Sequence, residues 1–265
     1  MDSEIFSPYH NFPNSAIFHN AYSDLNNRHK VAGTCTAIPR HHQSVLMKLQ
    51  RARQHLEDVI SIENWDASLF VHVPPTGSSG TISYGTSSAV SATNYTPAVH
   101  PLTVRVSGDL DDFFCNLFSA LDVLAQVINL IYFDPPYNEA DVAFWFIGDK
   151  LSRSSKQNER ITHAIQNVQT EQWFQEVKPF RKCATHRNSI MFKVETEFEP
   201  LQLFQSQKVT AIVLADDPFA SPPSYARKRN IESYGINILS DFLRTIDSLF
   251  EIMEQRIRTA DSIPI

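Results

Sequence analysis

Two residue types that can act on a phosphodiester stand five positions apart late in the chain, Arg181 and His186. Arginine offers a fixed positive charge and paired N–H donors that match phosphate oxygens. Histidine exchanges protons near neutral pH, so it can act as a general acid or base. Metal-free RNA cleavage needs both properties, because a 2′-hydroxyl must lose a proton while negative charge builds up on the phosphorus.

The spacing of this pair limits where it can stand. Five positions along an ideal helix turn the chain by about 500°, which leaves the two side chains about 140° apart. On one ideal helix, Arg181 and His186 would therefore not share a face. The pair must lie at a helix end, or a second subunit must complete it.

The surrounding residues add a resemblance to a known superfamily. The segment 178–188, which reads Lys-Pro-Phe-Arg-Lys-Cys-Ala-Thr-His-Arg-Asn, resembles the R-x4-6-H motif of HEPN domains. These are helical bundles that include metal-independent toxin and antiphage ribonucleases. Residues 116–129 are similar to the first bundle helix of several such families, and the resemblance covers about residues 108–258.

The resemblance implies a site and its partners. Arg181 would hold the phosphate and His186 would act as general acid or base, with Lys182 and Arg187 as substrate-binding cations. It implies no metal and no cofactor, RNA as the substrate, a cleft shared by two protomers of a homodimer, and a cognate antitoxin as a further partner. One position departs from the family, because Lys182 stands where Asn, Asp or His is common.

Composition restricts the class of protein. The 265 residues are 42% hydrophobic and 20% charged, which is typical of a soluble globular chain. The net charge of -6 gives no general attraction to phosphate, so contact with a nucleic acid requires a local basic patch. Three widely spaced cysteines and the lack of a signal-like or membrane-spanning run predict a cytoplasmic protein that does not enter the membrane.

Hydrophobic periodicity predicts a mainly α fold. We expect an irregular N-terminal region over 1–107, with one helix from Pro39 and short strands such as 102–106, and then a HEPN-like helical bundle over 108–265. The first bundle helix is expected from 107–109 to Asp134, and the second from about Asn138 to Leu151, with further turns at 160–165. A third, shorter helix should end before Pro179, and the last should cover 231–257. A small β insertion near 190–215 is expected to pair segments 191–198 and 208–214. The helices at 110–131 and 231–257 should pack together and bury Leu117, Leu121, Leu124, Leu239, Phe242 and Ile246.

Other interpretations remain open for these residues. Arg181 and His186 can be structural, with Arg181 paired to Glu176 and His186 capping a helix, and the bundle can be a non-catalytic module that binds a nucleotide or a protein partner. Residues 134–137 spell the Asp-Pro-Pro-Tyr of adenine amino-methyltransferases, but the chain has only 7 glycines and no G-x-G for a methyl donor. A helix stop and turn explains them better. His41, His42 and His55 show no metal-ligand spacing and no evident acidic partners.

Overall fold

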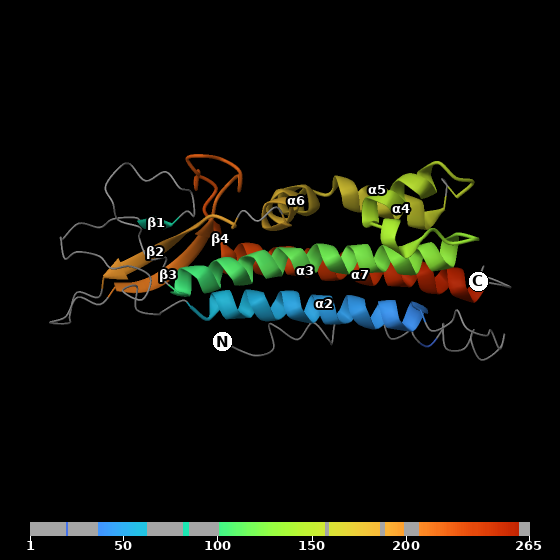
Figure 1. The fold of residues 1–265 in the computed structure, drawn as a ribbon, viewed down its shortest axis with the longest axis horizontal. Coiled ribbons are helices and arrows are strands. Elements are labelled where there is room, and N and C mark those ends of the chain that lie inside the picture. Colours follow the sequence, from blue (N-terminus) through green and yellow to red (C-terminus); the bar gives the residue numbers. More distant parts are fainter. Residues whose placement is uncertain are drawn as a thin grey trace. The chain divides into compact units, whose positions relative to one another are not determined.

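The structure, a computed structural model, describes residues 20, 37–62, 82–84, 101–156, 159–185, 189–198 and 207–259. These residues form a mainly helical protein with one small antiparallel sheet (Figure 1). The helices are α2 (Ala37–Ile60), α3 (Pro101–Tyr132), the 3-10 turn η4 (Glu139–Asp141), α4 (Phe144–Ser152), α5 (Arg160–Thr170), α6 (Gln172–Thr185) and α7 (Ile231–Thr259). The strands are β1 (Ile82–Tyr84), β2 (Phe192–Phe198), β3 (Gln207–Leu214) and β4 (Arg229–Asn230).

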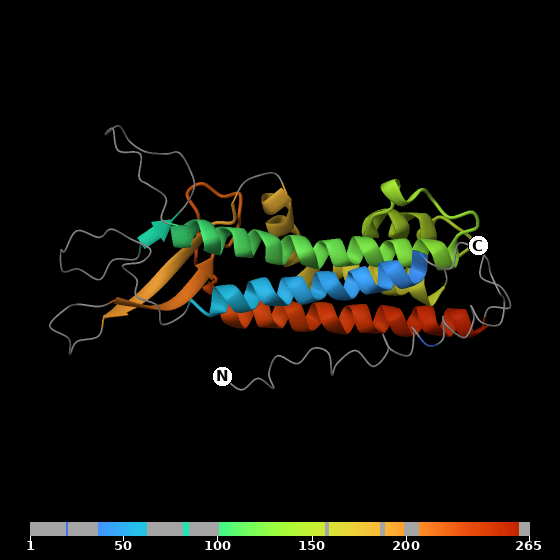
Figure 2. The ribbon, with the colours of Figure 1, turned by 60° about the horizontal axis from the view of Figure 1, so that its bottom comes forward.

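The chain divides into two compact units that are discontinuous in sequence. Unit 1 comprises 1–50, 117–175 and 239–265, and unit 2 comprises 51–116 and 176–238. Segments of α2, α3 and α7 run alongside one another within the units (Figure 2). Residues 107 and 108, where the sequence suggests a boundary, lie inside α3.

The core of unit 1 forms where the apolar faces of its helices meet. The Trp173 and Phe242 rings lie 5.5 Å apart, which joins α6 to α7, and Phe118 and Phe174 join α3 to α6 at the same distance. The Arg256 guanidinium lies over the Tyr132 ring, so α7 also contacts α3. All six residues expected in the core are at most 4% exposed: Leu117, Leu121, Leu124, Leu239, Phe242 and Ile246.

In the core of unit 2, α3 packs against α6 and α7 packs against α2. The Phe114 ring of α3 stacks on the Phe180 ring of α6, with centroids 4.9 Å apart and an interplanar angle of 14°. The α7 backbone comes so close to α2 that a Cβ on Gly235 would lie 2.5 Å from Leu56 Cδ1. Only glycine lets the two helices approach this closely without a shift.

The expected pairing of the two strands near 190–215 is confirmed. Strands β2 and β3 are antiparallel, with Phe192 opposite Leu214, and the register shifts at Glu195/Thr196. The sheet has the order β1-β2-β3-β4, so a segment near residue 83 and the two residues before α7 add the outer strands. These outer strands have weak sequence signals because they are only three and two residues long.

Two expectations about helix ends are wrong. Helix α3 begins at Pro101, so residues 102–106 are helical instead of a strand, and the helix does not start at 107–109. The burial of Thr103, Val106 and Leu110 follows helical spacing, and this packing outweighs the β preference of the local residues. Helix α6 does not end at Pro179 but continues to Thr185, because the next turn buries Phe180 and Cys183.

Two further helix predictions agree with the structure, and one helix starts later than expected. Helix α3 ends at Tyr132, immediately before the Asp134-Pro135-Pro136 stop, and α7 covers the expected C-terminal stretch. The helix expected from Asn138 instead begins at Phe144, after η4, because Asn138 caps that 3-10 turn through Ala140 N–H. The Asp-Pro-Pro-Tyr segment therefore follows a helix, whereas a methyltransferase motif would follow a strand.

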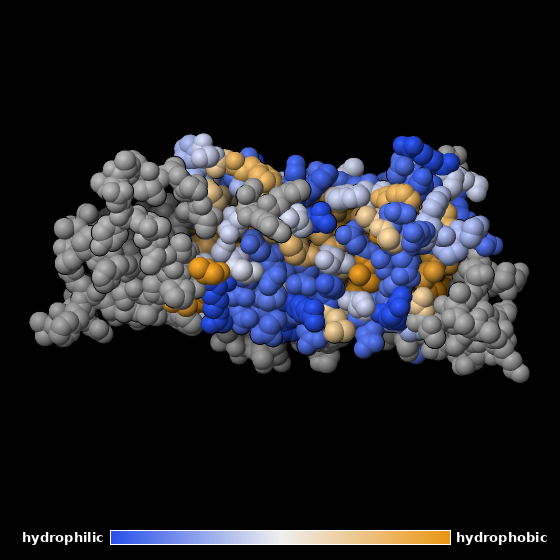
Figure 3. All heavy atoms as spheres, viewed as in Figure 1, coloured by the Kyte–Doolittle hydropathy of each residue, from blue (hydrophilic) through white to orange (hydrophobic). Residues whose placement is uncertain are grey.

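Helix α3 is also the part of the described chain that is long and apolar enough to cross a membrane. In its most apolar window, 67% is buried inside the protein, which fits the core helix of a soluble protein. The face shown in Figure 3 is mostly hydrophilic where it is coloured, with its apolar residues in small separate patches.

Candidate functional site

The last described turn of α6 presents the Arg181 region. Phe180 and Cys183 are buried in this turn, so helical geometry places Lys182 on the exposed side and Arg181 at the edge between the two. The Thr185 hydroxyl donates to the carbonyl oxygens of Arg181 and Lys182 at 3.0 and 3.2 Å. The turn that carries both cations is therefore capped, and the Phe180 stack on α3 fixes it in unit 2.

The other two expected site residues, His186 and Arg187, lie outside the described residues. Description ends at Thr185 and resumes at Ser189, so the structure brings Arg181 and Lys182 together and leaves the positions of His186 and Arg187 as predictions. Glu176, the expected alternative partner of Arg181, lies 3.3 Å from the Arg229 guanidinium.

A half-buried carboxyl from α3 contacts the chain directly after the motif. The Ile190 backbone N–H donates to Asp111 Oδ1 at 3.2 Å. Burial raises the pKa of Asp111 to about 6, the Ile190 hydrogen bond opposes this shift, and the charge of Asp112 adds to it. Asp111 therefore titrates near the pH range in which a histidine also titrates.

A thiol joins α6 to two neighbouring segments. Cys183 Sγ lies 3.8 Å from the carbonyl oxygens of both Ser189 and Pro218, to which the thiol donates. Burial raises the pKa of Cys183 to about 11, and the charges of Asp111 and Asp217 add to this shift. The sulfur therefore stays protonated at neutral pH and is a structural donor rather than a nucleophile.

The β3–β4 loop places an aromatic ring beside this turn. Phe219 is 45% exposed, and its backbone N–H donates to Asp217 Oδ1 at 2.8 Å. Lys182 Nζ lies 5.8 Å from the centroid of the Phe219 ring, within the range of a cation–π contact. An exposed aromatic ring therefore stands next to the cations of α6.

The same loop is held by a second aspartate. Asp216 accepts hydrogen bonds from the Ser224 hydroxyl and from the backbone N–H groups of Ala226 and Arg227. Burial acts to raise the pKa of Asp216, but these bonds and the charge of Arg229 outweigh burial and lower it. The loop is therefore fixed by bonds within itself before any ligand arrives.

Sequence reasoning missed Asp111, Asp217 and Phe219 as members of this site. Asp111 lies 70 positions before Arg181, and Phe219 lies 38 positions after it, so neither shares a motif with it. The available signal was the Asp216-Asp217-Pro218 run after a β-prone segment, which is typical of a turn that presents the next side chain.

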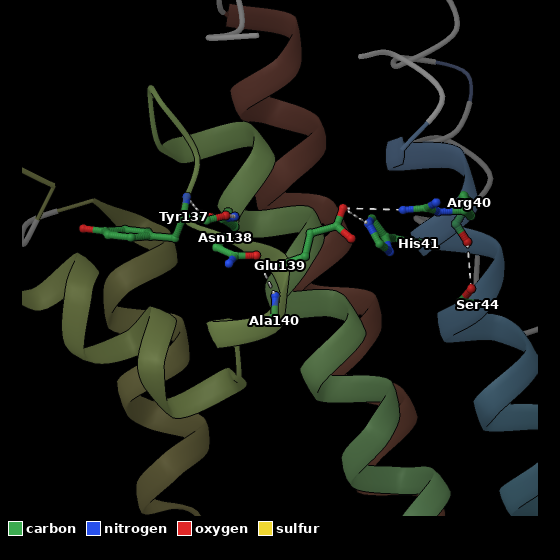
Figure 4. Close-up of polar contacts among 8 residues, drawn as sticks. Arg40, His41, Ser44, Tyr137, Asn138, Glu139 and Ala140 are labelled. Carbon is green, nitrogen blue, oxygen red and sulfur yellow. Dashed lines mark hydrogen bonds and ion pairs between the residues drawn. The ribbon is translucent and has the colours of Figure 1, made fainter. Parts of the chain in front are cut away.

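A second polar cluster lies in unit 1. His41 Nε2 is 3.1 Å from Glu139 Oε1, and Arg40 reaches the same oxygen at 3.4 Å (Figure 4). The His41 side chain is only 8% exposed. Glu139, the acidic partner of His41, is 98 positions away in the sequence, and the cluster connects α2 to η4.

The third histidine of interest also has acidic neighbours. His55 Nδ1 lies 3.0 Å from Asp109 Oδ1, and ligand atoms of His55, Asp58 and Asp109 lie within 4.8 Å of one another. The Arg105 guanidinium lies 3.7 Å from Asp109 Oδ2. A cation of the chain already faces this carboxylate, so the group is best described as an ion-pair network between α2 and α3.

Comparison of the chain with protein-family models, with curated proteins and with solved structures finds no match.

Proposed function

We propose that this chain is a metal-independent endoribonuclease of the HEPN type, which acts in the cytoplasm as a toxin or in phage defence. Arg181 holds the scissile phosphate, and His186 exchanges protons with the reacting oxygens. Lys182 and Arg187 bind neighbouring phosphates of the RNA. The chain uses no metal and no cofactor for this step.

The position of Arg181 in the last described turn of α6 carries this proposal. The 140° offset that separates Arg181 from His186 on an ideal helix applies only while the helix continues. Arg181 has exposed Lys182 as its neighbour, and Arg227 and Lys228 are exposed on the β3–β4 loop of the same unit. An acidic chain requires local positive charge to bind RNA, and we propose that Arg181 and Lys182 supply it next to the scissile phosphate.

The reaction requires two proton transfers. The 2′-hydroxyl loses its proton, its oxygen bonds to phosphorus, the bond from phosphorus to the 5′-oxygen breaks, and that oxygen gains a proton. The products are a 2′,3′-cyclic phosphate and a 5′-hydroxyl. A homodimer that brings two copies of His186 into one cleft supplies a base and an acid at once, which is why we propose a dimer.

The test compares purified wild-type protein with His186→Ala on single-stranded RNA in EDTA. We expect wild type to leave 2′,3′-cyclic phosphate ends, and His186→Ala to slow cleavage by about 10²–10⁴-fold, the usual effect of general acid–base catalysis. His163→Ala, which removes an exposed histidine of α5, is the matched control and should cleave at the wild-type rate. Arg181→Lys should also cleave slowly, because an ammonium lacks the planar pair of donors.

Two results would overturn the proposal. Equal cleavage by wild type and His186→Ala would assign the activity elsewhere. Intact RNA with wild type, together with binding of a nucleotide or protein partner that Arg181→Ala abolishes, would make the chain a non-catalytic module. Sedimentation at micromolar concentration tests the dimer, and a monomer in this experiment contradicts it. A cognate antitoxin should suppress cleavage when it is purified together with the protein.

A further inference from the structure

Phe219 is a large apolar side chain exposed on a loop that is held in place. Its backbone N–H donates to Asp217 Oδ1, Ala220 N–H donates to the Asp217 carbonyl at 3.2 Å, and the Cys183 thiol donates to the Pro218 carbonyl. Three consecutive residues are thus bonded to α6 or to their own turn. The backbone that carries the ring is therefore held in place, although exposing the ring gains no burial free energy.

The cations next to this ring are suited to bind the phosphates of a nucleic-acid backbone. Lys182 Nζ lies 5.8 Å from the ring centroid, and Arg181 is the next residue along the helix. The Asp217 carboxylate is occupied by the Phe219 N–H, and Asp216 is occupied by three donors of the loop. Both carboxylates therefore accept hydrogen bonds inside the loop, while the lysine is exposed.

We propose that Phe219 and Lys182 form a subsite that stacks one unpaired RNA base beside the phosphate held by Arg181. The inference rests on the proposed ribonuclease function. Every base has a π-face, so an exposed aromatic ring stacks any unpaired base, and a lysine beside it pairs with the adjoining phosphate. The flexible stem of Lys182 lets its ammonium turn to the phosphate while the ring receives the base.

The subsite selects unpaired over paired RNA. A base in a duplex is already stacked on its neighbours and must be taken out of the helix, at a free-energy cost, before it can reach Phe219. An unpaired base meets a ring that is already in place. The protein should therefore prefer single-stranded regions, with little dependence on which base is present.

The experiment measures the binding of a fluorescent eight-nucleotide 2′-O-methyl RNA, which lacks the free hydroxyl needed for cleavage. Stacking on an aromatic side chain is worth about 1–3 kcal/mol per base. Phe219→Leu should therefore weaken binding by about 5- to 150-fold, and Phe219→Trp should retain the affinity. A duplex of the same sequence should bind more weakly than the single strand.

Tyr137→Leu is the matched control. Tyr137 is also an exposed aromatic residue with a lysine over its ring, since Lys150 Nζ lies 5.5 Å from the ring centroid, but it belongs to unit 1. Its replacement should leave RNA affinity unchanged. Thermal unfolding of each variant confirms that the protein used for binding is folded.

The outcomes separate this inference from the proposed function. Equal affinities of wild type and Phe219→Leu, an equal loss in Tyr137→Leu, or no RNA binding by wild type each overturn the subsite. Wild-type binding that depends on Phe219 without cleavage of ordinary RNA supports the subsite and overturns the ribonuclease. If wild type and Phe219→Leu both cleave RNA with the same KM, the proposed ribonuclease function stands and the subsite is overturned. If Phe219→Leu does not change the RNA affinity, and a protein partner displaces the RNA probe, the subsite is overturned and the ring belongs to a protein-binding surface.

Discussion

Two pairs of a lysine and an aromatic ring have the same chemistry but differ in how the ring is packed. In unit 1, Lys150 Nζ lies 5.5 Å from the centroid of Tyr137 and 5.1 Å from that of Phe146. The Tyr137 ring also packs edge-on against Phe133 and Phe146, at 4.9 and 5.3 Å. In unit 2, Lys182 covers Phe219, for which no ring partner is described within the residues that the structure covers.

The backbones of the two aromatic residues differ in the same way. Asn129 of α3 donates to the Tyr137 carbonyl at 2.8 Å and accepts from its N–H at 2.9 Å, so Tyr137 is part of a closed packing cluster. Among the described residues, the Phe219 N–H donates to Asp217 of its own loop, and the neighbouring Pro218 carbonyl accepts from the Cys183 thiol. The Tyr137 ring therefore has a packing role, whereas no such role is described for Phe219, and this difference is why we propose a ligand only for the second pair.

The largest stability effect should separate the two rings. Tyr137→Ala removes two aromatic contacts, each worth about 0.5–1.5 kcal/mol, so the free energy of unfolding should fall by about 1–3 kcal/mol. Phe219→Ala should change it by less than about 0.5 kcal/mol, as for an ordinary surface residue. Urea denaturation measures both. A large loss for Phe219→Ala would show that this ring is structural and would remove the contrast.

A pH-dependent effect should arise at Asp111. Its pKa of about 6 in the folded protein exceeds the ordinary value of 3.8, so wild type loses stability as the pH rises from 3.8 to about 6, where the unfolded chain has lost this proton and the folded protein still holds it. Asp111→Asn keeps an oxygen that accepts the Ile190 N–H and avoids this charge. Relative to wild type, the variant should gain stability as the pH rises from 4 to 7, by about 1 kcal/mol after allowance for solvent screening.

Asp134→Asn is the control for this measurement, since Asp134 is exposed just after the end of the same helix. Chemical denaturation at pH 4, 5, 6 and 7 gives the dependence. A constant difference between Asp111→Asn and wild type over this range contradicts the raised pKa.

The smallest effect concerns the helix that serves both regions, since α3 supplies Asp111 to one and Asn129 to the other. Gly108 lies in its exposed interior, and a Cβ there would meet nothing within 4 Å. Gly108→Ala should therefore stabilise the protein by about 0.5–1 kcal/mol, because alanine loses less backbone entropy in a helix. Destabilisation, measured by the midpoint of urea unfolding, would argue that α3 does not extend through residue 108.

The long helices and the central strand pair were predictable because their buried residues repeat with a clear period. The start of α3 was not, since Leu102 to Val106 alternate like a strand and become helical only through packing of Thr103 and Val106. The helix end predicted at Pro179 failed for the same reason, because burial of Phe180 and Cys183 outweighs the backbone hydrogen bond that proline cannot make.

Half of the candidate site is a matter of tertiary structure. A motif identified Arg181 and Lys182 because they are local in sequence. The Asp111 carboxyl and the Phe219 ring join them only when α3 and the β3–β4 loop reach the end of α6. No spacing rule connects positions so far apart, and the contacts that hold them together include the Phe114–Phe180 stack and the hydrogen bonds of the loop.

The Cys183 thiol also makes the end of α6 a reporter of its own motion. A protonated, buried sulfur reacts with an alkylating reagent only after the local structure opens and the thiol ionises. Its two acceptors, the carbonyls of Ser189 and Pro218, lie on the two segments that flank the candidate site. The alkylation rate of Cys183 therefore reports how often the candidate site opens. An RNA that binds the closed site would lower this rate in proportion to the fraction of protein that carries RNA.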